Sequence, residues 1–394
     1  MRVAGPGAYV ALYVALYAAF GVASPFWPKF FETKGLTAQQ IGWLLTAAML
    51  MRLVSLPLVA ALADLLGSLR LVLAGCAIVA AAAAAALLRA DTFLLLLLVA
   101  LVQAVALAPT TAIADALSVN AARPQMAGRA FEYGWIRGGA SAAFVLGTLA
   151  VGQLISPAYL APVAWLNAIL LIAAAVATVW VPGPAAQAAS MGGLRSAVDG
   201  RFAVLRIPGF RSVIVVSALV YGSHAMHDAF AVIRWSDSGL GAPTISLLWS
   251  EAVVAEVVVF LLIGPAILDR LGARGAAVVA AAAGAVRWSV ASLTTSVLLL
   301  AVIQPLHGLT FALLHLACMR LMQAIVPITI AATAQALYAF GSGLVSALLT
   351  LVSGFLYGTY GGAAFIPMAG LCVIALPFAW SGFAGRTARS GTFG

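Results

Sequence analysis

The stretch LHGLTFALLHLACMR, residues 306–320, decides how the chain is interpreted. It lies inside an apolar run from about residue 295 to residue 325, and a membrane-spanning helix needs about 20 such residues. The stretch nevertheless contains His307, His315 and Arg320. An ionisable group in hydrocarbon costs roughly 3 kcal/mol or more, so such groups usually face the interior of a helix bundle or a water-filled cavity.

The two preceding apolar runs also carry charges. One contains Arg287, and the one before it contains Glu251 and Glu256. A cation, two carboxylates and two imidazoles on three successive spans indicate a site for a proton and a substrate. The alternative is that these groups form only structural ion pairs between helices.

The composition defines the class of protein. The chain has 394 residues, of which 64% are hydrophobic and 8% charged, with a mean hydropathy of +1.12. A soluble domain has about 25% charged residues, so we expect an integral membrane protein. The apolar runs are continuous and do not alternate with polar residues, which favours helices over a barrel. We expect an all-α membrane protein embedded in the lipid bilayer.

Several other classes find no support in the sequence. The three cysteines, Cys76, Cys318 and Cys372, all lie in predicted spans and suggest neither a disulfide framework nor a metal site. The chain contains no phosphate-binding glycine loop and no nucleophile elbow, so we expect neither an enzyme nor an ATP-driven pump. The net charge of +9 indicates membrane topology and not binding to nucleic acid. We expect no cofactor apart from a coupling proton.

The hydropathy pattern predicts twelve spans, near residues 8–30, 38–62, 70–89, 92–117, 132–154, 161–182, 210–233, 244–266, 275–294, 298–323, 330–357 and 363–383. The longest polar break runs from Pro182 to Pro208 and contains several prolines, glycines and arginines. We therefore predict a six-helix bundle over 1–182, a linker over 183–209 and a second six-helix bundle over 210–394.

The arginines and lysines of the predicted loops set the orientation. Twelve lie on the side of the N-terminus, against four on the other side (Lys29, Lys34, Arg89 and Arg234). Positive residues favour the cytoplasmic side, so both termini and the linker are expected there. Abundant alanine and a preference for arginine over lysine are typical of a bacterium with a GC-rich genome. We expect the bacterial inner membrane.

The two halves echo each other. Ile41 begins a helix that ends in Ala63-Asp64-Leu65-Leu66-Gly67, and Ile245 begins one that ends in Leu268-Asp269-Arg270-Leu271-Gly272. Two parallel six-helix repeats around a midplane site are the arrangement of major facilitator transporters. The second ending resembles the cytoplasmic loop motif of that superfamily, whereas the first departs from it at Leu65.

Separated segments resemble the lactose permease and phenylpropionate permease group of that superfamily. The segments are GVASPFWP (21–28), FEYGWIR (131–137), VAE (254–256), VR (286–287), LH (306–307) and TF (310–311), followed by His315 and Met319-Arg320. The resemblance covers nearly the whole chain. It implies the major facilitator fold, a small-molecule substrate and a monomer, with alternating access and proton coupling.

The resemblance also implies roles for particular residues. Arg137 matches an arginine that contacts the sugar in the lactose permease, and Asp115 falls near its acidic partner. Arg287 and His307 match an arginine and a histidine of the proton and sugar site. Thr310 stands where the lactose permease has its proton-carrying glutamate, so the proton must be carried elsewhere.

The depth of each group in its span suggests what it does. Glu256 lies roughly 18 Å along its predicted helix, near the bilayer midplane, where desolvation would let it carry a proton. His307 is the second candidate for proton coupling. For substrate binding we name Arg52, Asp115, Arg137, Arg287, Phe26 and Tyr338. For gating or structural charge we name Asp64, Glu132, Asp228, Glu251, Asp269, Arg270, His315 and Arg320.

We interpret the sequence as a secondary transporter that moves a small organic acid, possibly aromatic, together with a proton. A sugar or nucleoside proton symporter is the alternative within transport. A membrane sensor or scaffold that keeps the fold without transport is the alternative from another class.

Overall fold

The structure is a computed structural model that describes residues 6–121, 133–181 and 204–383. In the first 181 residues the helices are α1 (Pro6–Ala23), α2 (Trp27–Thr33), α3 (Ala38–Leu66), α4 (Leu69–Leu87), α5 (Phe93–Leu107), α6 (Thr110–Ala121), α7 (Tyr133–Leu154) and α8 (Ala161–Ala177).

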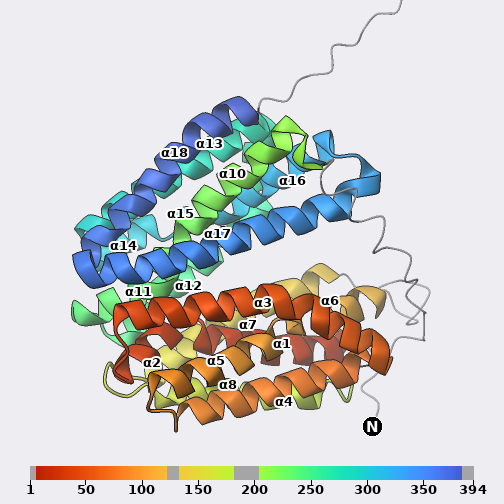
Figure 1. The fold of residues 1–394 in the computed structure, drawn as a ribbon, viewed down its shortest axis with the longest axis vertical. Helices are drawn as coiled ribbons and strands as arrows, with labels where there is room; N and C mark the ends of the chain where they lie inside the picture. Colours follow the sequence, from red (N-terminus) through yellow and green to blue (C-terminus); the bar gives the residue numbers. More distant parts are fainter. Residues whose placement is uncertain (1–5, 122–132, 182–203, 384–394) are drawn as a thin grey trace, which may run out of the picture. The chain divides into compact units, whose positions relative to one another are not determined.

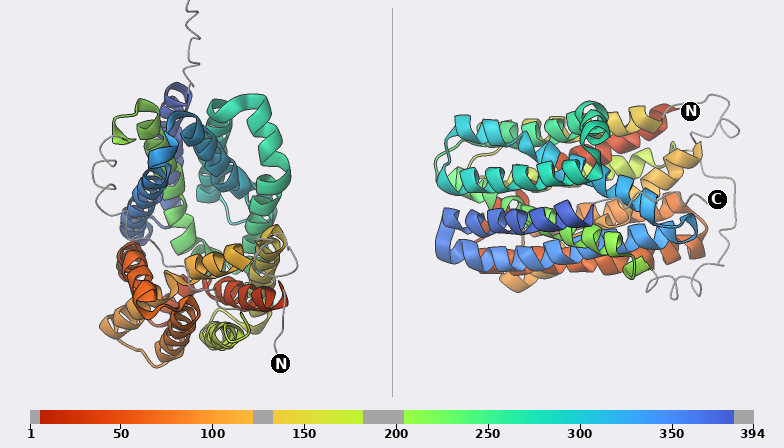
Figure 2. Two further views of the ribbon diagram at one scale, coloured as in Figure 1. Left: turned by 90° about the vertical axis from the view of Figure 1, so that its right-hand side faces the viewer. Right: turned by 90° about the horizontal axis from the view of Figure 1, so that it is seen from above.

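The described residues from 204 onward form a second series. It consists of α10 (Pro208–Gly222), α11 (His224–Asp237), α12 (Ala242–Val258), the π-helical turn η1 (Val259–Ile263), α13 (Gly264–Leu293), α14 (Val297–Ile303), α15 (Leu306–Gly308), the π-helical turn η2 (Leu309–Leu313), α16 (Leu314–Ile325), the short turn η3 (Ile328–Ile330), α17 (Ala331–Tyr360), the short turn η4 (Gly361–Phe365) and α18 (Ile366–Gly382). Within each compact unit, defined below, helices run side by side (Figures 1 and 2).

The predicted membrane-spanning organisation is confirmed. Six helical stretches of the described chain are long and apolar enough to cross a membrane, or seven if the bent pair α1 and α2 counts as one. Two of these stretches, Ala242–Leu293 and Ile328–Gly382, fold back at Gly272 and Gly361, so each holds two passages. The helices α3, α7 and α8 lie outside these stretches and correspond to the spans predicted near residues 38–62, 132–154 and 161–182.

Contacts divide the chain into two compact units that do not follow the order of the sequence. Unit 1 comprises residues 1–190 together with 227–251 and 350–361. Unit 2 comprises residues 191–226, 252–349 and 362–394. The bundle boundaries expected from the sequence stay a prediction. The linker expected over 183–209 lies outside the described residues as far as residue 203.

Each unit has its own apolar core. In unit 1 the core includes Tyr9, Leu12 and Leu16 of α1, packed with residues of α4, α6 and α8. In unit 2 it includes Phe210 of α10 and a series of alanines on α13, between 276 and 281, which are 0% exposed. Small residues at such contacts let the backbones of membrane helices approach closely.

The repeat seen in the sequence has a structural counterpart. Gly67, between α3 and α4, has φ 60°, and Gly272, inside α13, has φ 67°. Glycine adopts this left-handed conformation without the steric penalty that other residues suffer. Both copies of the Asp-x-x-Gly ending therefore turn the chain through the same kind of backbone geometry.

Candidate functional site

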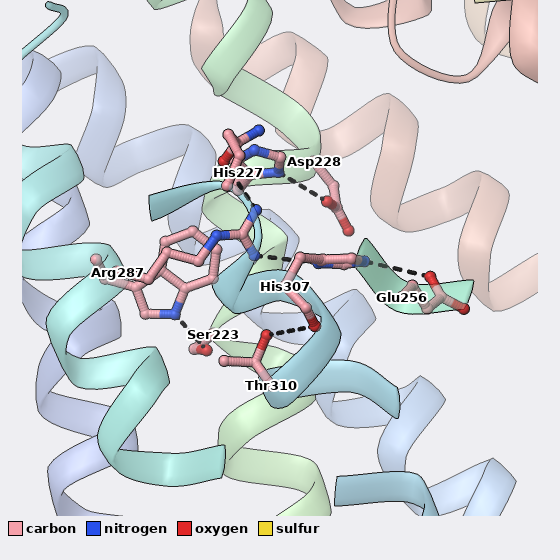
Figure 3. A network of polar contacts seen from close by, with 9 residues as sticks. Ser223, His227, Asp228, Glu256, Arg287, His307 and Thr310 are labelled. Atoms are coloured by element: carbon pink, nitrogen blue, oxygen red, sulfur yellow. Dashed lines mark hydrogen bonds and ion pairs between the residues drawn. The ribbon is translucent and has the colours of Figure 1, made fainter. Parts of the chain in front are cut away.

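A row of three ionisable side chains lies inside unit 2, and Figure 3 shows it. Nη1 of Arg287 is 3.1 Å from Nδ1 of His307, and Nε2 of His307 is 3.4 Å from Oε2 of Glu256. Nη2 of Arg287 donates to Oε1 of Gln304 at 3.1 Å. The Arg287 side chain is 0% exposed, whereas His307 and Glu256 keep 16% and 27% of their side-chain surface exposed. The row therefore leads from a buried cation to a partly accessible carboxylate.

The contacts define which nitrogen of His307 carries its proton. An arginine can only donate, so Nδ1 of His307 must accept from Arg287. The neutral ring then has its hydrogen on Nε2, directed at the carboxylate of Glu256. A proton added at Nδ1 would break the contact with Arg287. The imidazole therefore accepts from the cation at one nitrogen and faces the carboxylate with the other.

Buried aromatic and hydroxyl groups hold Arg287 in place. Its guanidinium lies 4.5 Å from the centre of the Trp288 ring, and the indole nitrogen of Trp288 donates to Ser223 Oγ at 2.7 Å. The ring of His224 lies 5.1 Å from that of His307 and 5.2 Å from that of Trp288. The cation is thus surrounded by rings and cannot turn away without disturbing the packing.

Irregular helix geometry positions the three groups. Pro305 lacks an N–H, and the helix is interrupted there, between α14 and α15. His307 follows in α15. The π-helical turn η2 comes directly after α15, and η1 follows Glu256 in the same way on α12. A Cβ atom on Gly308 would lie 2.6 Å from the carbonyl oxygen of Ala255. The glycine therefore permits the close approach of the two backbones that brings His307 to Glu256.

A second charged cluster lies in unit 1. Nη1 of Arg137 on α7 is 3.6 Å from Oδ1 of Asp115 on α6, and it donates a short hydrogen bond to the Tyr17 hydroxyl. The Tyr13 hydroxyl donates to the same Asp115 oxygen. The Tyr13 and Tyr17 rings are stacked, and Phe20 meets Tyr17 edge-on. Because 46% of the Arg137 side chain is exposed, this cluster presents a cation beside an aromatic wall.

Unit 1 also joins segments from both halves of the sequence at one end. Nζ of Lys29 lies 2.5 Å from Glu32 and 2.7 Å from Asp237 of α11. A Cβ atom on Gly354 of α17 would lie 2.8 Å from the carbonyl oxygen of Ala38, so α3 and α17 meet backbone to backbone. An ion-paired lysine and a glycine crossing hold these helix ends together.

The structure places the other predicted substrate residues apart from one another. Arg52 is exposed on α3 in unit 1, and Phe26 is buried at the bend between α1 and α2. Tyr338 is buried in unit 2, where its hydroxyl meets Tyr221 at 3.1 Å and His315 at 3.5 Å. Arg52 and Phe26 therefore belong to neither charged cluster as the structure has it.

The predicted gating or structural charges lie mostly toward helix ends. Asp269 and Arg320 form an exposed ion pair of 2.6 Å in unit 2, next to the exposed Arg270. Asp228 is exposed and lies 3.3 Å from Nδ1 of His227, and Glu251 is half-buried on α12. Glu132 and the side chain of Asp64 lie outside the described residues.

Sequence reasoning did not single out several residues of these clusters. Gln304 binds Arg287, and Tyr13 and Tyr17 bind the Asp115–Arg137 pair. Gln304 was detectable as a lone amide in an apolar run, and the two tyrosines as neighbours on one helix face at a spacing of four. Sequence reasoning assigned Glu256, Arg287 and His307 to one site without an order, and in the structure His307 contacts both of the others.

Comparison with known proteins gives concordant results. Residues 8–366 match the MFS_1 like family. The probable 3-phenylpropionic acid transporter of Escherichia coli (strain K12) is 29% identical over 369 residues, which cover 93% of this chain and 94% of that protein.

Solved structures agree with the fold. The nucleoside transporter NupG superposes with a TM-score of 0.84 at 17% identity, covering 96% of this chain and 98% of that one. A bacterial homologue of the human lysosomal transporter Spinster, inward-facing and unoccupied, gives a TM-score of 0.75 at 14% identity and 95% coverage of both chains. At these identities the likeness concerns the fold alone.

Proposed function

Since the chain belongs to the MFS_1 like family, and is therefore a membrane transporter with the major facilitator fold and not an enzyme, we propose that it couples a proton to the transport of a small aromatic carboxylic acid. The observation that carries the proposal is the row Arg287–His307–Glu256 inside unit 2. A carboxylate joined through an imidazole to a buried cation can gain and lose a proton and alter the field at the cation.

The coupling would proceed through the imidazole. When Glu256 is ionised, it accepts from Nε2–H of His307, whose Nδ1 accepts from Arg287. When Glu256 takes up a proton, the negative end of the row is neutralised and the attraction that aligns His307 weakens. Any substrate that favours one of these two arrangements must then favour one protonation state as well, since linkage is reciprocal.

The carboxylate of the substrate would bind at Arg137. A guanidinium offers a planar fork that matches a carboxylate, and 46% of the Arg137 side chain is exposed. Asp115, at 3.6 Å, would give way to the incoming anion while keeping its bond from Tyr13. The rings of Tyr17 and Phe20 would contact an aryl group. The 29% identical relative is a probable 3-phenylpropionic acid transporter, which supports an acid of that type.

Transport would follow alternating access as symport. The contacts of Lys29 with Asp237 and of α3 with α17 would break and reform in each cycle, because they join segments from the two halves of the sequence. We expect the carrier to lie in a bacterial inner membrane as a monomer, with both termini in the cytoplasm.

The test is uptake into reconstituted vesicles. Labelled 3-phenylpropionate should accumulate above its equilibrium level when a pH gradient is imposed, and a proton uncoupler should abolish the accumulation. The same vesicles should be offered a sugar and a nucleoside. Accumulation of either of these in place of the acid would overturn the substrate class, and equilibration of the acid without proton movement would overturn the coupling. A chain that moves none of them would match the sensor or scaffold alternative.

A further inference from the structure

A second polar network lies in unit 2, and the proposed function does not use it. Tyr338 on α17 donates to the Tyr221 hydroxyl on α10 at 3.1 Å, and Tyr221 donates to the carbonyl oxygen of Phe311 at 3.4 Å. Nδ1 of His315 lies 3.5 Å from the Tyr338 hydroxyl. Since the hydrogen of Tyr338 is directed at Tyr221, His315 is the donor in this contact and has its hydrogen on Nδ1. Its basic nitrogen is then Nε2.

The π-helical turn explains why this imidazole faces the same region as His307. The two histidines are eight residues apart, which in a regular α-helix places them about 80° apart around the axis. The turn η2, Leu309–Leu313, lies between them and takes up one additional residue. The helix beyond it is rotated back by about 100°, so the two rings point within about 20° of each other.

Glu256 contacts one of the two imidazoles and interacts electrostatically with the other. It contacts Nε2 of His307 at 3.4 Å, and it also interacts electrostatically with His315 and with Tyr221. The ring of Phe260, in the turn η1 that follows Glu256, packs against His315 with 5.7 Å between ring centres.

His315 lies on the side that leads out of unit 2. It is about 12 Å beyond His307 along the helix, toward the end where α16 finishes and α10 begins. These two ends meet, because a Cβ atom on Gly209 would lie 2.9 Å from Ile325. Arg320, five residues after His315, is exposed and paired with Asp269. Solvent is thus within about two helical turns of the second imidazole.

We propose that His315, oriented by Tyr338 and Tyr221, takes the proton that leaves Glu256 and passes it to water at the end of unit 2 that carries Ile325. This inference rests on the proposed function. The O–H bond of protonated Glu256 breaks, and an N–H bond forms at Nε2 of His315, directly or through a bridging water. The imidazolium then releases the proton to solvent, and no electrons are transferred. The other titratable groups around His315 are Tyr221, Tyr338 and Cys318.

The test separates proton release from substrate movement. His315→Asn keeps a polar group beside the Tyr338 hydroxyl but removes titration near neutral pH. In reconstituted vesicles, exchange of 3-phenylpropionate across the membrane at equal pH should stay within about twofold of the wild type. Uptake driven by a pH gradient should fall by about 100-fold or more, since one positioned acid–base group typically contributes that much. Its pH profile should also move toward alkaline pH, where hydroxide can remove the proton.

Two further variants distinguish a relay from packing. Tyr338→Phe keeps the ring and removes the hydroxyl that orients His315, so it should lower the ratio of driven uptake to exchange. Phe260→Leu removes the aromatic neighbour of His315 without removing a titratable group, so it should leave the ratio of driven uptake to exchange unchanged.

Three results would overturn the inference. The first is a His315→Asn protein that shows driven uptake at the wild-type level, and the second is one in which exchange and driven uptake fall equally. The third is a Phe260→Leu protein in which the ratio of driven uptake to exchange changes as much as in His315→Asn. A wild-type protein that never moves protons with the acid would instead contradict the proposed function itself.

Discussion

Nε2 of His307 lies 3.4 Å from a carboxylate oxygen of Glu256, and the other nitrogen of the same ring accepts from the fully buried Arg287. The imidazole therefore contacts both the cation and the carboxylate. Under the proposed coupling, a change in the charge of Glu256 would alter the position of His307 and so its contact with Arg287. The predictions below follow from it.

Replacing Arg287 should damage both stability and coupling. Arg287→Ala leaves Gln304 and His307 without their buried cation. The free energy of unfolding should therefore fall by about 2 to 5 kcal/mol. Thermal unfolding in detergent measures it. Arg287→Lys should recover only part of the activity, because one ammonium cannot reproduce two directed bonds from a planar fork. Near-normal transport by the lysine variant would mean that any positive charge suffices at this position.

Gly308→Ala should separate the helices that carry His307 and Glu256. The added Cβ atom would lie 2.6 Å from the carbonyl oxygen of Ala255, so the backbones must move apart at a cost of about 1 to 3 kcal/mol. Driven uptake should fall more than exchange. Gly370→Ala on α18 is the matched control, since apart from its own stretch of helix backbone nothing lies within 4 Å of its Cβ position. If driven uptake and exchange change equally in the two variants, the close approach of the backbones at Gly308 does not matter for coupling.

Arg137 and Tyr17 should determine affinity for the acid. Loss of a charge-assisted hydrogen bond costs roughly 1.5 to 3 kcal/mol, so Arg137→Gln should raise the KM for 3-phenylpropionate about 10- to 100-fold. Tyr17→Leu should weaken binding of an aryl acid more than that of an alkyl acid of the same length, because only the former uses the ring. Uptake kinetics with the two acids measure both effects. An unchanged KM in Arg137→Gln would place the anion elsewhere.

The orientation in the membrane can be tested by labelling. We expect the 183–209 segment on the cytoplasmic side, so a cysteine at Gln187 should react with an impermeant thiol reagent only after the cells are opened. A Cys76→Ser background removes the one native cysteine that is not buried. Efficient labelling of intact cells would contradict the predicted topology.

The fold and the chemical nature of the site were predictable to different extents. Length and apolarity of the helical runs suffice for twelve passages, because a backbone in lipid must satisfy its own hydrogen bonds. The residues Glu256, Arg287 and His307 were identifiable as charges in such runs. The contacts among them were not predictable. They depend on the interruption of the helix at Pro305 and on two π-helical turns, which rotate the directions of the side chains that follow.

Other features depend on packing between distant segments. A regular α-helix would place His315 about 80° away from His307 around its axis, and the turn η2 removes most of that angle. Lys29 was expected only as a loop charge on the outer side, but it is buried between Glu32 and Asp237. Asp237 belongs to α11, far along the chain from Lys29. The hydropathy of a single segment cannot predict a contact with such a distant residue.

The most direct test of the account is Glu256→Gln in reconstituted vesicles, with exchange and driven uptake of 3-phenylpropionate measured on the same preparation. The glutamine amide keeps the size of the side chain and can still accept from Nε2–H of His307, but it cannot take up a proton. We expect exchange to persist and accumulation driven by a pH gradient to disappear. A Glu256→Gln protein that still concentrates the acid against its gradient would contradict the claim that Glu256 carries the coupling proton.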